Sequence, residues 1–395
     1  MQLSQAMSRL GTETAFEVLA RARALEAKGR DIVHLEIGEP DFDTPGHIAE
    51  AATQALAQGY THYCPAQGLP ELREAIAREV SQSRGIEVDP ARVVVTPGAK
   101  PIMFYSILAL LQPGDEAIYP NPGFPIYESM INFTGARAVP IPLREELEFR
   151  LDVNELRSLA NRRTRLIIIN SPQNPTGGVL EASDIETIAE IATQNDSIVL
   201  SDEVYRHILY EGKHYSIASL PGMLDRTILL DGFSKTYAMT GWRIGYAVVP
   251  SGLVEPLVKL IVNSVSCTAT FIQRAALQAL KGPQDSIGKM VEEFRQRRDL
   301  IVDGLNAISG ISCLRPKGSF YVFPNVRGLG VDTHELADHL LQEAGVATLA
   351  GTSFGSYGRG YLRVSYANST ENLKKALDRI AKVVAKLPIP AKGPA

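Results

Sequence analysis

The sequence DGFSKTYAMTGWRIGY, residues 231–246, decides how the chain is interpreted, because it places one lysine directly after an apolar run. That run, residues 227–230 (TILL), predicts a buried β-strand, so Lys235 would lie just beyond the strand's end. Glycines two residues before and after Arg243 allow the backbone to turn tightly or to approach a ligand. A desolvated lysine can form a Schiff base, and an arginine can bind a phosphate through its planar fork. The stretch suits a pyridoxal phosphate site, although a solvated lysine would be the better explanation of Ser-Lys-Thr taken alone.

Two further apolar runs are followed by polar residues that can carry chemistry. Residues 166–169 (LIII) precede the sequence NSPQNPTG at 170–177, and residues 197–201 (SIVLS) precede DEVY at 202–205. Both runs predict buried strands, and ligands of α/β sheets bind where the strands end. We therefore expect these polar residues to surround one site together with Lys235.

Taken in order, these motifs resemble those of a known family. Asn-Pro-Thr-Gly, then Asp-Glu-x-Tyr, then Ser-Lys followed by Gly-x-Arg-x-Gly is similar to the pattern of class I/II aminotransferases, which are fold-type I enzymes dependent on pyridoxal 5'-phosphate. The resemblance runs from about Leu35 to Arg363. It is nearest to the branch with bacterial and archaeal aspartate and aromatic amino acid aminotransferases. It implies an α/β fold with a large domain around a mostly parallel sheet and a smaller α+β domain.

The same pattern suggests how the chain is divided. We expect residues 1–45 to form an N-terminal arm and part of the small domain, residues 46–290 the large cofactor-binding domain, and residues 291–395 the small C-terminal domain. Apolar periodicity and capping residues give the local elements. Helices are predicted at 14–28, 69–81, 268–281, 287–307 and after Ser369, and strands at 32–37, 92–96, 116–119, 311–314, 318–323 and 360–365.

The resemblance assigns Lys235 as the catalytic residue that bonds to the cofactor aldehyde. Asp202 is expected beside the pyridine nitrogen, where a carboxylate favours the protonated ring. Asn174 and Tyr205 correspond to hydrogen-bond partners of the phenolic oxygen, and Phe124 to the aromatic side chain that stacks on the ring. The alternatives are a strand-end carboxylate that caps a helix for Asp202 and an ordinary loop aromatic for Phe124.

The turn PGAK at 97–100 precedes a predicted helix, whose free N–H groups and positive dipole end suit a phosphate. The resemblance assigns the phosphate to the amides of Ala99 and Lys100 and to Ser234 and Arg243. The family often has Ser or Thr near this turn, so the role of the Lys100 side chain stays open. The resemblance also implies a homodimer in which Tyr63 reaches the phosphate of the other subunit; a packed loop tyrosine is the alternative.

Three residues are expected to contact the substrate. Gly38, in the turn GEPDF at 38–42, is similar to a family glycine beside the substrate, and an ordinary strand-to-turn glycine explains it equally well. Arg363 is similar to the arginine that binds the α-carboxylate bidentately. Strand alternation directs it away from its apolar neighbours, and an ion pair on the solvent face is the alternative. Asn174 is the third.

The resemblance implies transfer of an amino group from an L-amino acid to a 2-oxo acid, with 2-oxoglutarate the expected acceptor, by a ping-pong mechanism through a Lys235 aldimine. The preferred substrate side chain is not indicated. The main alternative is other chemistry on the same scaffold, such as a C–S β-lyase. A ligand-sensing transcription regulator is disfavoured, because only about 30 residues precede the first predicted strand, too few for a DNA-binding domain.

Composition excludes several other classes. A chain of 395 residues with 45% hydrophobic residues and a net charge of −4 fits a soluble globular enzyme and offers no basic run for nucleic acid or a membrane surface. The sparse cysteines, absence of a secretory signal and lack of a long apolar run predict a cytoplasmic location. No Gly-x-Gly-x-x-Gly follows a strand, and His334 and His339 lack zinc-helix spacing, so neither a dinucleotide site nor a metal site is expected.

Overall fold

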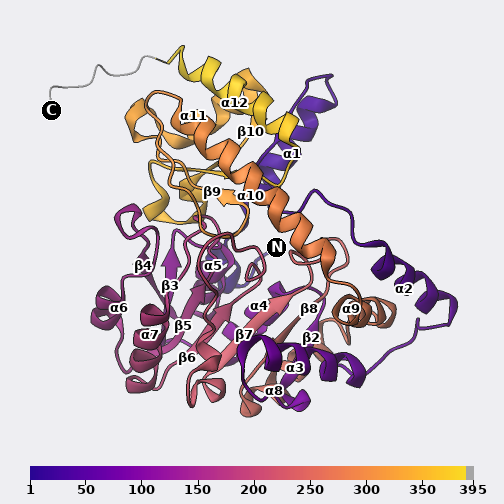
Figure 1. Ribbon diagram of the computed structural model, residues 1–395. Helices are drawn as coiled ribbons and strands as arrows, with labels where there is room; N and C mark the ends of the chain where they lie inside the picture. The colour runs from indigo at the N-terminus through magenta and orange to yellow at the C-terminus, as the bar shows by residue number, and fades with distance from the viewer. Residues whose placement is uncertain (388–395) are drawn as a thin grey trace.

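A seven-stranded sheet forms the centre of the larger part of the molecule (Figure 1). The structure is a computed structural model and describes residues 1–387. The strands are arranged in the order β2-β8-β7-β6-β5-β3-β4. Strand β8 is antiparallel to β2 and β7, and all other neighbouring pairs are parallel. Their bounds are Val93–Thr96 (β2), Gly245–Val248 (β8), Thr227–Gly232 (β7), Ile198–Asp202 (β6), Thr164–Asn170 (β5), Glu116–Asn121 (β3) and Arg137–Pro142 (β4).

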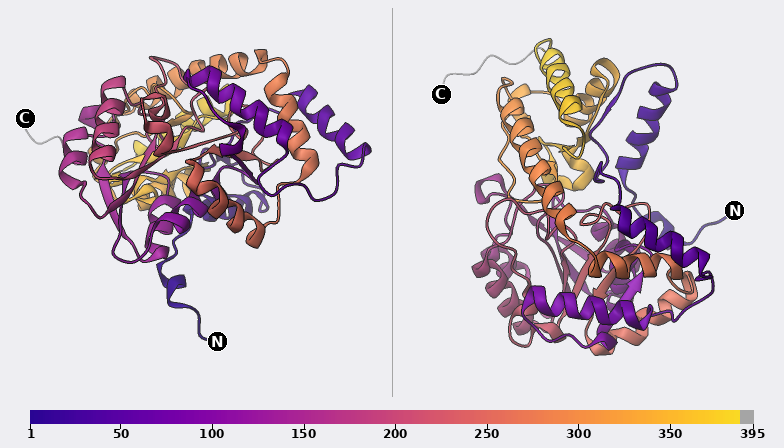
Figure 2. Two further views of the ribbon diagram at one scale, coloured as in Figure 1. Left: turned by 90° about the horizontal axis from the view of Figure 1, so that it is seen from below. Right: turned by 45° about the vertical axis from the view of Figure 1, so that its right-hand side comes forward.

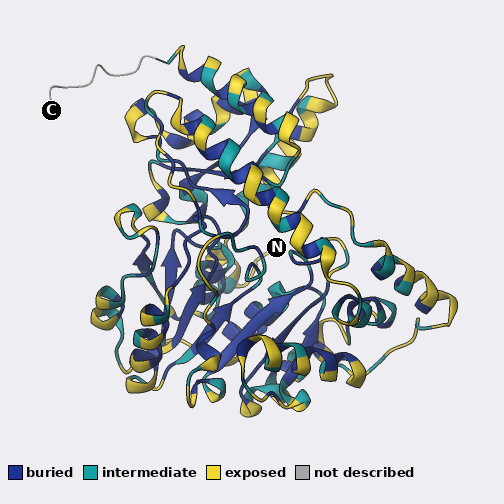
Figure 3. Cartoon of the chain, viewed as in Figure 1, coloured by how far each residue is buried: buried dark blue, intermediate teal, exposed yellow. Residues whose placement is uncertain are grey.

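Helices cover both faces of this sheet, and its strands are buried (Figure 3). Because both faces of the central strands are covered, their sequences are continuous apolar runs. One face packs against α4 (Lys100–Leu110), α5 (Ile126–Thr134) and α8 (Ser251–Ser264). The other face packs against α3 (Pro70–Arg84), α6 (Val153–Leu159), α7 (Ala182–Gln194) and α9 (Thr270–Lys281), with α2 (Gly46–Ala57) lying on α9. We call the sheet and these helices the sheet unit.

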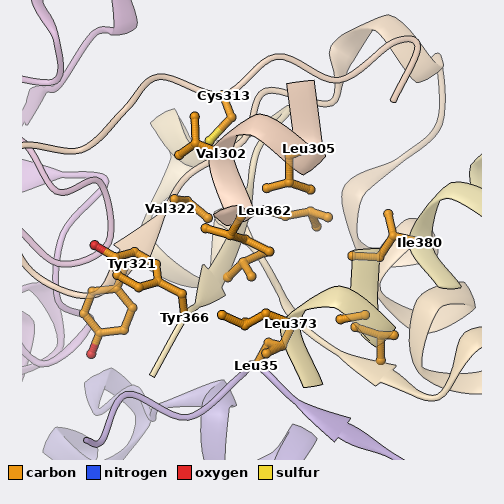
Figure 4. Close-up of a cluster of buried hydrophobic side chains, with 14 of the residues drawn as sticks. Leu35, Val302, Leu305, Cys313, Tyr321, Val322, Leu362, Tyr366, Leu373 and Ile380 are labelled. Carbon is orange, nitrogen blue, oxygen red and sulfur yellow. The ribbon is translucent and has the colours of Figure 1, made fainter. Parts of the chain in front are cut away.

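The remaining elements pack around a separate hydrophobic cluster, and we call them the small unit (Figure 4). Its sheets are β11-β12-β9, which is antiparallel, and the parallel pair β1-β10. The strands are β1 (Val33–His34), β9 (Tyr321–Val322), β10 (Val346–Ala347), β11 (Leu349–Ala350) and β12 (Leu362–Ser365). The helices are α1 (Thr14–Glu26), α10 (Asp285–Asn306), α11 (Thr333–His339) and α12 (Thr370–Val384). The chain therefore returns its N-terminal segment to its C-terminal part, and Figure 2 shows α1 beside the yellow C-terminal helices.

Helix α10 joins the two units. Ile287, in its first turn, belongs to the cluster that also contains residues of α3 and α9. Met290, Phe294 and Leu305 belong to the cluster of the small unit. One continuous helix thus contributes apolar side chains to both cores.

The predicted helices are confirmed, with small shifts at their ends, and so are the strands of the large sheet. The strand predicted at 311–314 is wrong, because only Ser312 forms an isolated bridge, to Asn325. The Asn306 side chain at the end of α10 hydrogen-bonds both the N–H and the carbonyl of Cys313, at 2.8 and 3.0 Å, which are groups that a ladder would otherwise use. The strands predicted at 32–37 and 318–323 are present but shortened to two residues each.

None of the helices within residues 1–387 combines the length and the apolar character that crossing a bilayer requires.

Candidate active site

A cavity of about 520 Å³ lies at the ends of β5, β6 and β7, between the sheet unit and the small unit. Every predicted site residue except Tyr63 lines it. These residues are Gly38, Ala99, Lys100, Phe124, Asn174, Asp202, Tyr205, Ser234, Lys235, Arg243 and Arg363. Parallel strands place the residues that follow them at a common edge, which explains why motifs far apart in the chain meet here. Tyr63 is 87% exposed on this chain and does not line the cavity.

Lys235 lies in the turn after β7 and extends its amine across the cavity. The Nζ atom donates a hydrogen bond to the carbonyl of Gly38 in the small unit, and it lies 6.0 Å from the centre of the Tyr205 ring. Burial lowers the pKa of Lys235 to about 8, against an opposing contribution from the Glu39 carboxylate. A lysine with this pKa is partly unprotonated near neutral pH, which is the form that acts as a nucleophile or a base.

Asp202 is the last residue of β6 and is buried at the floor of the cavity. Its Oδ2 accepts a hydrogen bond of 2.6 Å from the hydroxyl of Tyr127, a fully buried residue of α5. Its Oδ1 accepts a longer one, at 3.4 Å, from the N–H of Val204. Burial raises the pKa of Asp202 to about 6, and the hydrogen bond from Tyr127 opposes that rise.

Asn174 and Tyr205 follow β5 and β6 and line the same part of the cavity. The Asn174 N–H donates to Oδ1 of Asn170 at 2.9 Å, which orders the turn after β5. The hydroxyls of Tyr205 and Tyr321 are hydrogen-bonded at 2.8 Å. Tyr321 belongs to β9 of the small unit, so this pair of phenols joins the two sides of the cavity.

The turn before α4 approaches the strand β8 very closely. A Cβ atom on Gly245 would lie 2.4 Å from the N atom of Ala99, so only glycine permits this approach. A Cβ on Gly98 would lie 2.2 Å from Nη2 of Arg243, which shows how close that guanidinium lies to the turn. Arg243 itself has a positive φ of 56° and donates to the carbonyl of Thr240 at 2.8 Å. The start of α4 and this cation therefore form one end of the cavity, next to Ser234.

The Lys100 side chain has a partner outside the motifs. Its Nζ forms an ion pair with Glu13, which immediately precedes α1, and lies 5.4 Å from the centre of the Phe124 ring. Glu13 and Phe16 also line the cavity. The N-terminal segment thus covers the side of the cavity that carries Phe124 and Lys100.

Arg363, in β12, is a buried cation without a carboxylate partner in the described part of the chain. Its Nη2 donates to the carbonyl of Glu36, its Nη1 lies 3.4 Å from Oδ1 of Asn174, and its Nε has no partner. The guanidinium carbon lies 4.6 Å from the ring centre of Tyr321 and 4.8 Å from that of Phe354. The two aromatic rings restrict the orientation of the guanidinium without neutralising its charge.

Gly38 is required where it stands. A Cβ atom at this position would lie 1.9 Å from the Tyr321 hydroxyl oxygen. The glycine lets the segment between β1 and α2 pass directly over Tyr321, where its carbonyl meets the amine of Lys235. Its place is therefore more constrained than that of an ordinary strand-to-turn glycine.

Sequence reasoning missed several residues of this site. Tyr127, Tyr321, Glu13 and Phe16 contact or line the cavity, but none of them belongs to a motif considered above. Tyr127 lies three residues after Phe124, and this spacing is the one sequence signal that could have indicated Tyr127 as a site residue. The others reach the cavity from distant parts of the chain.

A buried charge cluster lies behind the strand ends that carry Asp202 and Lys235. We define it as Arg84, Glu203, Asp231 and Arg206, whose side chains are 2%, 1%, 2% and 11% exposed. Arg84 lies 2.8 Å from Glu203 and 3.1 Å from Asp231, and Arg206 lies 2.7 Å from Asp231. Burial alone would raise the pKa of Asp231, but Arg206 and Arg84 hold it below its usual value. The two acids and two arginines pair with each other there, and both arginines also pair with the more exposed Glu79. In the sequence, Glu203 directly follows Asp202, and Asp231 precedes Lys235 by four residues.

The residues present fit pyridoxal phosphate. The cavity has the size of a small-molecule site and holds a partly neutral lysine, a buried carboxylate and an aromatic ring. At one end, a helix start lies against the cation of Arg243, as a phosphate requires. The unpartnered Nε of Arg363 leaves donor capacity for an acidic substrate group.

Comparison with known proteins agrees with this chemistry. The model of the family described as aminotransferase class I and II matches residues 30–380. The chain is 46% identical to an aspartate aminotransferase of Pyrococcus abyssi, over 90% of this chain and 92% of the relative. It is 43% identical to aromatic-amino-acid aminotransferase 2 of Thermococcus litoralis, over 89% and 92%. The solved Thermus thermophilus aspartate aminotransferase with maleate superposes with a TM-score of 0.93 at 39% identity, covering 97% of this chain and 100% of that one.

These findings confirm the predicted family, fold type and cofactor, and they do not favour the C–S lyase alternative. The chain belongs to the class I and II aminotransferase family and is a transaminase that depends on pyridoxal 5'-phosphate.

Proposed function

We propose that this enzyme transfers the amino group of an L-amino acid to a 2-oxo acid, with Lys235, Asp202 and Arg363 as its three central residues. The cofactor, when bound, supplies an aldehyde that accepts the amino group and a ring that withdraws electrons. Phe124 would lie against the face of that ring, and Asn174 and Tyr205 would bind its phenolic oxygen. The amides of Ala99 and Lys100, together with Ser234 and Arg243, would hold the phosphate.

Lys235 is proposed to move the proton. With a pKa of about 8, its amine can take the proton from the substrate Cα and would deliver it to the carbon of the cofactor aldehyde group. Asp202 is proposed to keep a proton on the ring nitrogen, because its carboxylate is stabilised by Tyr127 from behind. Removing either group should leave the cavity intact while slowing proton transfer.

The observation that carries the substrate assignment is the unpaired guanidinium of Arg363. A buried arginine without an acid among residues 1–387 leaves a charge to be compensated, and the α-carboxylate of an amino acid supplies that charge bidentately. Amino acids and 2-oxo acids share this carboxylate, so one arginine serves both half-reactions. Gly38 and Asn174 would complete the substrate contacts.

For the substrate side chain, we propose a dicarboxylic amino acid, with 2-oxoglutarate as the acceptor. Relatives named aspartate aminotransferase support this choice, and so does the Lys100 ammonium at the cavity wall, which can exchange Glu13 for a substrate carboxylate. An aromatic donor is the second candidate, because Phe16 and Phe124 flank the same lysine and a relative is named for aromatic amino acids.

We also propose a cytoplasmic homodimer with the domain division 1–45, 46–290 and 291–395. Tyr63 supports the dimer, because it is 87% exposed and would be free to reach the phosphate of a second subunit. The division follows the two hydrophobic clusters that α10 connects near Met290. Separate cores of this kind are the usual basis of domains.

A half-reaction screen tests the proposal. The pyridoxal phosphate-loaded protein is mixed with single amino acids without an acceptor, and the released 2-oxo acid is measured per subunit. From aspartate and glutamate we expect about one equivalent, because the aminated cofactor is converted back only by a 2-oxo acid acceptor. From the Lys235→Ala variant we expect none, because it lacks the group that moves the proton. Continuous release of ammonia from a sulfur amino acid, without an acceptor, would instead identify a lyase.

A further inference from the structure

The segment from Glu36 to Gly38 binds two of the cations that line the cavity, Lys235 and Arg363. The carbonyl of Glu36 accepts from Nη2 of Arg363, and the carbonyl of Gly38 accepts from Nζ of Lys235. These two carbonyls are two residues apart in an irregular stretch that follows the short strand β1. Any displacement of this stretch would therefore move both cations relative to the cavity.

The Glu36 side chain anchors the segment through a histidine. Glu36 is fully buried, and its Oε1 accepts from Nδ1 of His34 at 2.7 Å, while its Oε2 has no partner among the described residues. On the other side, Nε2 of His34 lies 3.1 Å from Oε1 of Glu26, the last residue of α1. Hydrogen bonds to both ring nitrogens and two acid neighbours keep the imidazole protonated, and the hydrogen bond to Glu36 raises the pKa of His34 to about 9.

The backbone around this pair is joined to the strand that carries Arg363. The carbonyl of His34 accepts from Nδ2 of Asn368 at 2.9 Å, and the carbonyl of Leu35 accepts from the N–H of Ser365 at 2.8 Å. Ser365 is the last residue of β12, two positions after Arg363. The His34–Glu36 ion pair and these two hydrogen bonds together fix the position of Glu36 relative to the guanidinium of Arg363.

The buried carboxylate of Glu36 is also a potential competitor for Arg363. Burial lowers the pKa of Arg363, the Glu36 carboxylate is among the groups that oppose this change, and no ion pair between the two side chains forms within the described residues. An ionised carboxylate in an apolar interior requires a cationic partner. Without His34, the Glu36 carboxylate loses its cationic partner, and Arg363 is a buried cation that already contacts Glu36 through the backbone carbonyl. A carboxylate paired with Arg363 would occupy the place of the substrate.

We propose that His34 and Glu36 are positioning residues for Arg363: their ion pair fixes the segment 36–38 and keeps the Glu36 carboxylate away from the guanidinium. The inference rests on the proposed role of Arg363 as the carboxylate-binding residue. His34 contacts neither substrate nor cofactor in this arrangement, so it acts only through Glu36.

The test measures binding of maleate, a dicarboxylate without an amine or a ketone, to the pyridoxal phosphate-loaded enzyme by calorimetry, together with steady-state kinetics. His34→Gln removes the cation and releases Glu36. We expect the Kd for maleate and the KM for both substrates to rise about tenfold, the scale of one charged hydrogen bond, with kcat nearly unchanged. Cofactor affinity, measured by absorbance titration, should stay the same.

The double variant His34→Gln/Glu36→Gln separates positioning from general destabilisation. An amide at position 36 cannot compete for Arg363 and can still pair with the amide at position 34, so we expect maleate affinity to return to within about threefold of the parent. Glu26→Gln is the matched control, since it removes the outer, more exposed acid of the same histidine; it should change Kd less than twofold.

Each outcome decides the proposal. Loss of affinity in the single variant with recovery in the double variant supports it, as does a single variant that fails to fold while the double variant folds. Equal losses in both variants, unchanged maleate binding in the single variant, or failure of both to fold would overturn it. Arg363→Lys is measured in parallel: if that change leaves maleate binding intact, the proposed function of Arg363 is wrong, whatever His34 does.

Discussion

The two walls of the cavity are built differently. The sheet wall, which we define as Asn174, Asp202, Ser234 and Lys235, consists of residues at the ends of parallel strands or in the turns that follow them. The small-unit wall, defined as Gly38, Tyr321 and Arg363, consists of residues on short strands and on an irregular segment. Each sheet-wall residue is held by a long buried strand, whereas each small-unit residue is held by contacts with distant parts of the chain.

This difference predicts two kinds of sensitivity. Changes on the sheet wall should affect the chemical step, because its rigid strands position groups for proton transfer. Changes on the small-unit wall should affect substrate binding, because its residues contact the part of the substrate that does not react. Three predictions test this division, and a fourth concerns the histidine that anchors the segment 36–38.

The largest effect is expected at Lys235. Lys235→Ala removes the group that moves the proton, so kcat should fall by about 10⁴-fold, at the upper end for general acid–base catalysis. Pyridoxal phosphate should still bind, but reduction with borohydride should no longer fix it to the protein, as mass spectrometry of peptides would show. Reduced cofactor found on another lysine of the parent protein would contradict the assignment.

Arg363→Lys tests the small-unit wall. Lysine keeps the charge but loses the planar fork, so we expect a loss of about 2–4 kcal/mol in kcat/KM for amino donor and 2-oxo acceptor alike. Cofactor affinity should barely change. A simple amine without a carboxylate serves as the control substrate and should react equally poorly with both proteins. An effect on only one of the two substrates would show that Arg363 is not the shared carboxylate site.

Tyr127→Phe tests the support behind the sheet wall. Loss of the 2.6 Å hydrogen bond should raise the pKa of Asp202 further and lower kcat about tenfold, with KM nearly constant. The acidic limb of the pH profile should shift to higher pH. Asp202→Asn, measured in parallel, should lower kcat by a larger factor, since the carboxylate itself is lost. A Tyr127→Phe effect confined to KM would show that Tyr127 does not act through Asp202.

The smallest effect concerns stability and His34. The pKa of folded His34, about 9, exceeds its ordinary value of 6.5, because Glu36 and Glu26 face it. The stabilisation from this proton is therefore complete below pH 6.5 and disappears as the pH rises through 9. Urea unfolding of the parent and of His34→Gln should give free energies of unfolding that converge between these pH values. Parallel curves would indicate that His34 is not protonated in the folded state.

The same contrast explains what could be predicted from the sequence. Buried parallel strands appear as apolar runs, and the polar residues after them, such as Asp202 and Lys235, were therefore predicted at one edge of a sheet. Tyr127 was missed because its contact with Asp202 depends on how α5 packs. Glu36 was missed because its role depends on contacts with His34 in β1 and Arg363 in β12. Tyr63 stays a prediction, since it concerns a second subunit.

Heat should act differently on the two walls. Apart from the His34–Glu36 ion pair, the small-unit wall depends on aromatic packing around Arg363, by Tyr321 and Phe354, and the contribution of apolar burial per unit area levels off at high temperature. The buried charge cluster of Arg84, Glu203, Asp231 and Arg206 belongs to the sheet-wall side, since Glu203 directly follows Asp202 and Asp231 belongs to β7. The cost of removing charges from water falls as temperature rises, so the ion pairs of this cluster become relatively more favourable when the protein is warm. On heating, we therefore expect the substrate-binding side of the cavity to loosen before the side that carries Lys235.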